Sequence, residues 1–313
     1  MNRRLYRTVL LVVVSAWVLT GLAEPASQRS SPEFASMARN ATRLAERGHC
    51  SEALPMLEKI VGHLTDRELL YKVGFSRAQC AMSLGRNAAV FQALSQLHRD
   101  FPDDPHVLYV TAQYCSMLAE KAARDLAEKA PDSYQAQQLE AEAFEAHAQW
   151  EKAEAQYRKI LQQYPDLPNI HYRIARIVLA KPGSPSTLEQ AQKELEAELK
   201  SNPNSATAEF LLGDLARQQQ MWDSAIDHFS RATKVDVGFS EAYLGLGMVY
   251  NAAGQYSQAV GPLETYVKSQ PDDAAGHQQL AMAYARAGRK EDAARELQRQ
   301  RELNERLNKE QKQ

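Results

Sequence analysis

Three glutamates stand close together near the middle of the chain, at Glu140, Glu142 and Glu145. A pair of neighbouring carboxylates is the arrangement that general acid and base catalysis uses. These three, however, fall in a stretch with helical spacing, where charged residues usually form the face of the helix that meets water. We therefore interpret them as a solvated helix face.

Other residue types that carry chemistry lack the spacing that the chemistry requires. The eight histidines are scattered, and none forms an HExxH pair or another metal-binding spacing. Gly245-Leu246-Gly247 begins like a dinucleotide-binding loop, but Tyr250 stands where the third glycine belongs. Phosphate-binding and nucleophile-elbow motifs are absent as well. The sequence thus predicts no catalytic residue, no metal and no cofactor.

Composition and charge narrow the class of protein further. The chain has 313 residues, of which 44% are hydrophobic and 24% charged, and its mean hydropathy is -0.50. Arg3, Arg4 and Arg7 are the only charged residues among the first 23, and without them 34 basic residues face 39 acidic ones. An acidic chain without a basic cluster is a poor electrostatic match for nucleic acid, so we predict no nucleic-acid partner.

The first 23 residues are typical of an export signal. Three arginines precede an uncharged run at residues 8–23, which ends in small residues before Glu24. This order predicts a secretory signal cleaved after Ala23, with the rest of the chain in the periplasm or secreted. The alternative is an uncleaved anchor in the inner membrane formed by residues 8–23, although a spanning helix needs about 20 residues. We expect residues 24–32 to form a flexible leader without packing of its own.

Three cysteines, Cys50, Cys80 and Cys115, lie far apart within helical patterns. Unpaired cysteine packs as a small hydrophobic residue, and we favour buried, unpaired cysteines here. An exported chain with three cysteines could instead form one disulfide and leave one thiol free.

A repeated spacing organises the second half of the chain. One alanine recurs with a period of about 34 residues, and a large apolar residue follows it four positions later each time. The alanines are Ala153, Ala191, Ala225, Ala259 and Ala293, and the apolar residues are Tyr157, Leu195, Phe229, Leu263 and Leu297. Only the first interval, from Ala153 to Ala191, is longer than the others. Several positional series that share one period indicate stacked structural repeats.

The physical logic of one unit is clearest in residues 240–273. Tyr243, Leu246, Gly247 and Tyr250 fall on one face of a helix, which Gly254 ends. A second helix follows until a proline stops it. Gly247 is small where the two helices must approach closely. Each hairpin leaves an apolar face that only a neighbouring hairpin can cover.

This repeating pattern, LG…Y…G.Y..A…L…P, resembles the tetratricopeptide repeat. The resemblance is strong over residues 133–307 and moderate over residues 33–132, and residues 308–313 form a polar tail. It implies an all-α fold, a right-handed superhelical solenoid of about eight antiparallel hairpins. The segment 104–131 is short, so its hairpin is expected to be shortened. The polar end of the chain is expected to extend the last helix.

The resemblance also implies where a partner binds. Members of this family usually hold ligands on the concave surface built by the first helix of each hairpin. The matching positions here are Tyr172, Arg176, Phe210, Asp214, Arg217, Leu244, Met248, Asn251, Gln278 and Met282. Aromatic, methionine and arginine side chains suit contacts with a protein or peptide. The alternative for Phe210 or Leu244 is packing between hairpins.

Two functional hypotheses follow, and neither is enzymatic. The leading one is a protein-interaction scaffold that acts outside the cytoplasm and binds a protein or peptide. The alternative is a permanent assembly subunit of an envelope, secretion or polymer-export complex. The Lys and Asn positions of the family's carboxylate-binding chaperone adaptors are occupied by other residues, such as Phe210 and Asp214, which argues against a cytosolic co-chaperone. A third hypothesis, an unrecognised hydrolase, would need a polar cluster that the sequence does not show.

Overall fold

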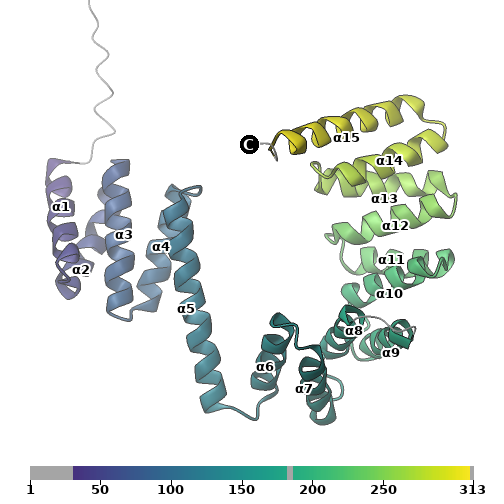
Figure 1. Ribbon diagram of the computed structural model, residues 1–313. Helices are drawn as coiled ribbons and strands as arrows, with labels where there is room; N and C mark the ends of the chain where they lie inside the picture. The colour runs from purple at the N-terminus through teal and green to yellow at the C-terminus, as the bar shows by residue number, and fades with distance from the viewer. Residues whose placement is uncertain (1–30, 182–185, 311–313) are drawn as a thin grey trace, which may run out of the picture. The chain divides into compact units, whose positions relative to one another are not determined.

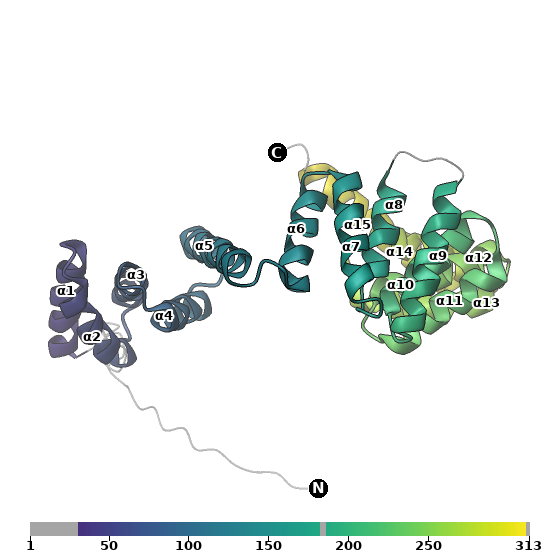
Figure 2. The ribbon, with the colours of Figure 1, turned by 90° about the horizontal axis from the view of Figure 1, so that it is seen from below.

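The computed structural model describes residues 31–181 and 186–310, and all regular elements in these residues are helices (Figures 1 and 2). The chain divides into two compact units, residues 1–121 and 122–313, which we call unit 1 and unit 2. The predicted signal segment 1–23 and residues 24–30 of the predicted leader lie outside the described residues. None of the described helices combines the length and the apolar character that crossing a bilayer requires.

Unit 1 consists of two helical hairpins and one long helix. Its elements are α1 (Pro32–Glu46), α2 (Cys50–Ile60), the 3-10 turn η2 (Val61–His63), α3 (Arg67–Ser83), α4 (Asn87–Asp100) and α5 (Pro105–Lys129), the last of which continues past the unit boundary. We call the N-terminal helix of each hairpin its first helix and the C-terminal one its second helix.

Unit 2 consists of five consecutive hairpins, which Figure 1 shows following one another from teal to yellow. They are α6 (Tyr134–Ala146) with α7 (Trp150–Gln163), α8 (Ile170–Ala180) with α9 (Ser186–Ser201), α10 (Ala206–Gln218) with α11 (Trp222–Val235), α12 (Ser240–Ala252) with α13 (Tyr256–Ser269), and α14 (Ala274–Arg286) with α15 (Lys290–Glu310). Each hairpin contacts the next one, so the predicted solenoid of antiparallel helical hairpins is confirmed.

Several first helices begin with a side-chain cap. Ser133 accepts a hydrogen bond from the Ala136 N–H group at 3.3 Å, and Ser205 accepts one from the Ala208 N–H group at 3.3 Å. Such caps satisfy N–H groups that have no partner inside the helix. Ser31 likewise caps α1, and Pro32 is its first residue. The last two residues of the predicted leader therefore begin the fold.

The hairpin turns place one residue in the left-handed region. Glycine holds this position in four hairpins, at Gly48, Gly85, Gly254 and Gly288, but Ala148 (φ 53°) and Gln220 (φ 59°) hold it in two others. A side chain with a Cβ atom pays a steric cost there that glycine avoids.

The repeated small residues mark places where helices approach closely. Ala153, Ala225 and Ala259 are fully buried. Phe229 lies between Gly213 and Gly245, and a Cβ atom added to either glycine would come within 3.0 Å of its ring. A Cβ atom on Gly247 would overlap Leu263. The predicted close approach at Gly247 is therefore confirmed.

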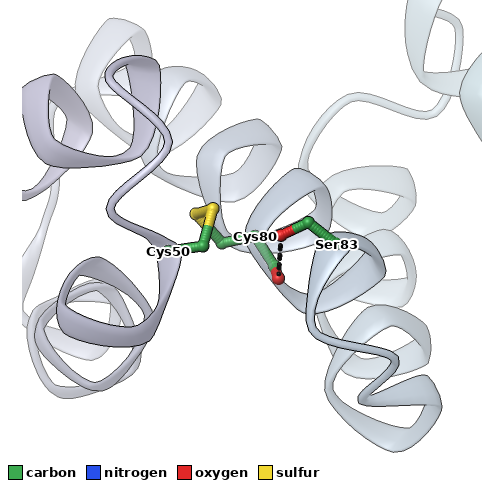
Figure 3. Close-up of a disulfide and its surroundings, with 3 residues drawn as sticks. All are labelled: Cys50, Cys80 and Ser83. Carbon is green, nitrogen blue, oxygen red and sulfur yellow. Dashed lines mark hydrogen bonds between the residues drawn. A yellow bond between two sulfur atoms is a disulfide. The ribbon is translucent and has the colours of Figure 1, made fainter.

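A disulfide joins Cys50 at the start of α2 to Cys80 in α3 (Figure 3). The two Cα atoms are 4.8 Å apart, a separation that suits a disulfide. Cys115 lies exposed on α5. The favoured prediction of three buried, unpaired cysteines is thus wrong, and the alternative of one disulfide and one free thiol holds. Helical spacing within the sequence could not show that α2 and α3 bring these two side chains together.

The segment 104–131 is not a shortened hairpin, because α5 runs through it as a single helix of 25 residues. No glycine or proline interrupts residues 106–129, so nothing in the sequence provides a turn. The described residues therefore hold seven hairpins and one single helix, where about eight hairpins were expected.

The last helix, α15, extends through the polar end of the chain to Glu310, as predicted. Ala293 and Leu303 are its buried residues. Leu297, expected in the apolar series, is 39% exposed instead. α15 is the second helix of the last described hairpin, and no described helix covers its outer side.

Histidine–glutamate pairs join the two helices of three hairpins in unit 2. Glu209 and His228 approach to 2.6 Å between α10 and α11, and His277 and Glu296 to 2.6 Å between α14 and α15. His277 stands two repeat periods after Glu209, and Glu296 stands two periods after His228. The two hairpins thus use the same positions with the residue types exchanged. His171 of α8 pairs with a glutamate of α9 in the same way.

Candidate partner-binding surfaces

Three first helices of unit 2 adjoin one another along the array. α10 contacts α12, and α12 contacts α14, in addition to the contacts within each hairpin. The predicted binding residues all lie on these helices and on α8. The structure brings α10, α12 and α14 together, and it gives the ten side chains different surroundings.

Nine of the ten side chains are exposed or half-buried, and seven of these are the charged, amide, methionine and tyrosine side chains that suit an adaptable contact. Arg176, Gln278 and Met282 are exposed. The other four are half-buried, and they are Tyr172, Asp214, Arg217 and Met248. We call these seven residues the accessible set, because they can meet a partner without rearrangement of the fold.

Arg176 lines a pocket of about 440 Å³ between α6, α7 and α8. Glu142, Glu145 and Trp150 line the same pocket, together with Arg173. The Arg173 guanidinium lies 2.7 Å from Glu142 and 3.4 Å from Glu145. These two glutamates therefore form ion pairs with the next hairpin, and the expectation of a merely solvated helix face is wrong for them.

Tyr157 extends this polar cluster into the core. It is fully buried, and its hydroxyl donates to Glu145 at 2.6 Å. Burial and this hydrogen bond raise the pKa of Tyr157 strongly, although the nearby Arg173 opposes the shift. The Arg176 guanidinium lies 5.9 Å from the centre of the Tyr172 ring, and no carboxylate of the described residues forms an ion pair with it. Arg176 is thus the pocket's available cation.

On α10 a carboxylate holds two neighbouring side chains in place. Asp214 accepts hydrogen bonds from Arg217 at 2.6 and 2.9 Å and from Gln218 at 2.8 Å. Asp214, Arg217 and Gln218 thus present a carboxylate, a guanidinium and an amide side by side on the surface of α10.

Two of the three remaining predicted residues pack inside the fold. Phe210 is half-buried and packs against Phe229 and Phe239, with ring centres 5.6 and 5.0 Å away. Leu244 is also half-buried and packs on the core formed by the last two hairpins. Both observations favour the alternative of packing between hairpins for these two residues.

Asn251, the last of the ten, is 4% exposed and joins α12 to α14. Its Nδ2 atom donates to the backbone oxygen of Gln279 at 3.1 Å and to its side-chain oxygen at 3.2 Å. Its Oδ1 atom is buried without a hydrogen-bond partner. Asn251 therefore links two first helices and keeps one acceptor unused.

Unit 1 has an apolar pocket between α3 and α5 that the sequence did not indicate. A volume of about 530 Å³ is lined from α3 by Tyr71, Phe75 and Met82, and from α5 by His106 and Val110. The His106 ring stacks on Phe75 with centres 4.6 Å apart. The repeat spacing is irregular in unit 1, so it gave no basis for predicting that these residues line a pocket.

A second hollow continues this surface along α5. It measures about 410 Å³ and shares Met82 and Val110 with the first pocket. Tyr109 and Met117, which also line it, are 61% and 50% exposed. Exposed aromatic and methionine side chains are typical of adaptable protein contacts. The described residues contain no group of three or more His, Cys, Asp or Glu that could hold a metal.

Comparisons with known proteins place the repeats in a family. Three tetratricopeptide-repeat family models match the chain, over residues 135–167, 188–236 and 216–278. All three matches lie in unit 2, and they confirm the predicted resemblance. No curated protein matches the chain.

Solved structures of the same fold match about half of the chain. A MamA RS-1 ArsTM double mutant aligns with a TM-score of 0.51 at 16% identity, covering 56% of this chain and 97% of that one. MamA 41-end from Desulfovibrio magneticus RS-1 gives 0.49 at 17% identity, covering 56% and 96%. YrrB, described as a TPR protein with an unusual peptide-binding site, gives 0.49 at 18% identity, covering 58% and 92%. At these identities the likeness concerns the fold alone.

Proposed function

This chain belongs to the tetratricopeptide-repeat proteins by its residues 135–167 and 188–278, and we propose that it is a non-enzymatic scaffold that binds a protein or peptide outside the cytoplasm. The partner lies across the first helices of unit 2, over the accessible set. Binding, not chemistry, is the proposed activity.

One observation carries this proposal. The first helices α10, α12 and α14 contact one another in turn, and they present the Asp214–Arg217 pair, Met248 and Met282 at least partly exposed, while Arg176 is exposed on α8 of the preceding hairpin. A row of charged, amide and methionine side chains on adjoining rigid helices can hold an extended chain by both polar and apolar contacts.

A location outside the cytoplasm is part of the proposal. The basic and apolar residues 1–23 support it as an export signal. The disulfide between Cys50 and Cys80 also supports it, because disulfides persist in oxidising compartments. Mass spectrometry of the protein purified from its own cells tests this part. A mature chain that begins at Glu24 is expected, and an intact N-terminus in a cytoplasmic fraction would contradict it.

Site-specific photo-crosslinking tests the binding surface with a matched pair of positions. Met282 on first helix α14 is 41% exposed, and Leu297 on second helix α15 is 39% exposed. A photo-reactive residue at position 282 is expected to capture one defined partner in intact cells, whereas the same residue at position 297 is expected to capture none. The two positions differ in the helix they occupy and hardly in exposure.

Charge reversal on the same surface provides the second arm. Arg176→Glu and Arg217→Glu are expected to reduce the yield of the captured partner without changing the helix content by circular dichroism. Equal capture from positions 282 and 297, or capture unaffected by both reversals, would overturn the proposed surface.

The alternative is a permanent subunit of an envelope, secretion or polymer-export complex. The apolar hollows on unit 1, with Tyr109 and Met117 exposed, favour it, because permanent interfaces are richer in apolar surface than transient ones. Size-exclusion chromatography of a detergent-free extract separates the two functions. A scaffold that binds transiently elutes as a monomer after dilution, and a permanent subunit stays in a large complex.

A further inference from the structure

Arg77 is a buried arginine whose charge the fold leaves without a carboxylate. It lies in α3 of unit 1 and is 6% exposed. Its Nη1 atom donates to the side-chain oxygen of Gln96 at 2.9 Å, and its Nε atom is buried without an acceptor. Among the described residues no carboxylate forms an ion pair with it.

Such an arrangement is costly for the protein alone. Arginine is almost never fully buried unless it is paired, because removing the guanidinium from water costs free energy that an anion must offset. Burial lowers the pKa of Arg77, and Glu58 on α2 opposes this shift by Coulomb attraction. Glu58 itself is exposed, so solvent and salt screen its attraction to Arg77.

Arg77 lines a pocket of about 550 Å³ on the side of the second helices. Val61 and Gly62 of η2 form one wall, and α4 forms the other. The α4 wall consists of Phe91, Gln92, Ser95, Gln96 and Arg99. The pocket thus combines two arginines, two amides and a hydroxyl with one aromatic ring, and no acidic residue belongs to this described lining.

We propose that this pocket binds an oxyanion, a carboxylate or a phosphate, which Arg77 and Arg99 hold together. Arg77 supplies N–H groups from the buried end, and exposed Arg99 closes the contact from the rim. The Gln92 and Gln96 amides and the Ser95 hydroxyl donate to the remaining oxygens. Guanidinium groups suit both anions because their planar fork matches two oxygens at once.

This site is separate from the surface proposed for the partner in unit 2. It lies in unit 1 on the side of the second helices, whereas the crosslinking positions lie on α14 and α15. Failure of either proposal leaves the other intact.

Isothermal titration calorimetry of the full chain tests the site with defined probes. Inorganic phosphate and citrate are titrated at constant ionic strength set with chloride, so that general screening does not change. Binding at one site by at least one of the two probes is expected. The stronger probe identifies the source of the anion as phosphate-like or carboxylate-like.

Three variants assign the binding to these residues. Arg77→Met keeps the length of the side chain without the charge and is expected to weaken binding by about tenfold or more. Arg99→Gln is expected to weaken it by a smaller factor, since Arg99 is exposed. Glu58→Gln removes the nearby negative charge and is expected to tighten binding.

Arg77→Met also provides the control for folding. Arg77→Met removes the desolvation cost of a buried charge and fills the same space with an apolar side chain, so this variant is expected to melt at the same temperature as the parent or higher. Loss of binding with retained folding supports the site. Absence of binding by both probes to the parent chain, or binding that survives both arginine substitutions, would overturn it.

Discussion

Units 1 and 2 are built from the same element, a helical hairpin, but they hold their hairpins together differently. Unit 1 joins α2 to α3 by the Cys50–Cys80 disulfide and places aromatic rings and Met82 on its first helices. No cysteine follows Cys115 in the sequence, and the hairpins of unit 2 follow a regular repeat period after the longer first interval from Ala153 to Ala191. The contrast indicates that hairpins with a regular repeat period can cover one another's apolar faces by packing alone. Hairpins with an irregular period are stabilised further by a disulfide.

In unit 2 an ion-pair network joins the α6–α7 hairpin to the α8–α9 hairpin. Glu154 of α7 lies 2.5 Å from Lys181 after α8 and 2.8 Å from Arg158, which also reaches Glu194 of α9 at 3.0 Å. Burial opposes ionisation of Glu154, but hydrogen bonds from Lys181 and Arg158 hold its pKa below the usual value. This network joins one hairpin to the next without any covalent bond.

Removal of the disulfide is expected to have the largest effect on stability, and it tests the comparison of units 1 and 2. The closed loop spans a sequence separation of 30 residues, so Cys50→Ala with Cys80→Ala is expected to cost unit 1 about 3–4 kcal/mol. Hydrogen exchange measured by mass spectrometry should show faster exchange in peptides from residues 32–100 and no change in residues 206–310. Cys115→Ala, at an exposed position, is the control and should change neither. Equal loosening of unit 2 would break the comparison.

Overpacking tests the dependence of unit 2 on its repeated alanines. Ala259 is fully buried in α13, so Ala259→Leu is expected to cost about 1–3 kcal/mol. A denaturant melt followed by circular dichroism measures it. Ser257→Leu, on the exposed side of the same helix, is the matched control. A melt unchanged by Ala259→Leu would show that the alanine series does not mark close packing.

Tyr284 tests a polar contact between hairpins of unit 2. Its hydroxyl donates to Glu264 at 2.5 Å, and Tyr284→Phe is expected to cost about 1 kcal/mol. Burial raises the pKa of Tyr284 to about 12, and the hydrogen bond to Glu264 is the second cause of this rise. The folded pKa lies above the unfolded value of about 10, so this stabilisation is present below about pH 10 and is lost as the pH rises towards 12.

Alkaline melts check the sign of that dependence. The parent chain is expected to lose more stability than the Tyr284→Phe variant between about pH 10 and 12. A variant that loses as much as the parent would show that Tyr284 does not titrate with folding.

The smallest expected effect concerns the hairpin turns. Both hairpins of unit 1 turn at glycine, whereas unit 2 has Ala148 and Gln220 in left-handed conformations. Gln220→Gly removes the steric cost and adds some unfolded-state freedom, so a net gain of about 0.5–1 kcal/mol is expected. Gly254→Ala, at the equivalent turn of the next hairpin, should destabilise instead. Chemical denaturation of both variants would show the opposite signs.

The sequence predicted unit 2 more completely than unit 1 for a physical reason. Period and amphipathic spacing are local signals, and they correctly located the helices from Tyr134 onward and the close approach at Gly247. The disulfide and the uninterrupted α5 depend on which helices meet in space and on the absence of a turn. The irregular repeat spacing of unit 1 therefore predicts neither the disulfide nor the single helix α5.

The same distinction applies to the candidate binding surfaces. Position within the repeat correctly placed all ten predicted residues on first helices, but it could not show that Phe210 packs on two other rings or that Asn251 is buried. Arg77 carried no sequence signal, because an arginine in a helical pattern ordinarily faces water. Only its burial and the lack of a carboxylate partner among the described residues set it apart.

The exchanged histidine–glutamate pairs have a consequence for how such an array can change in length. Glu209 finds its counterpart in His228, and His277 finds Glu296, in both cases inside the same two-helix module. Duplicating or deleting a whole module in the gene therefore adds or removes the histidine and the glutamate together, and it leaves neither residue without its partner. The chain can grow or shrink by modules, and each of the three modules that contain such a pair keeps it.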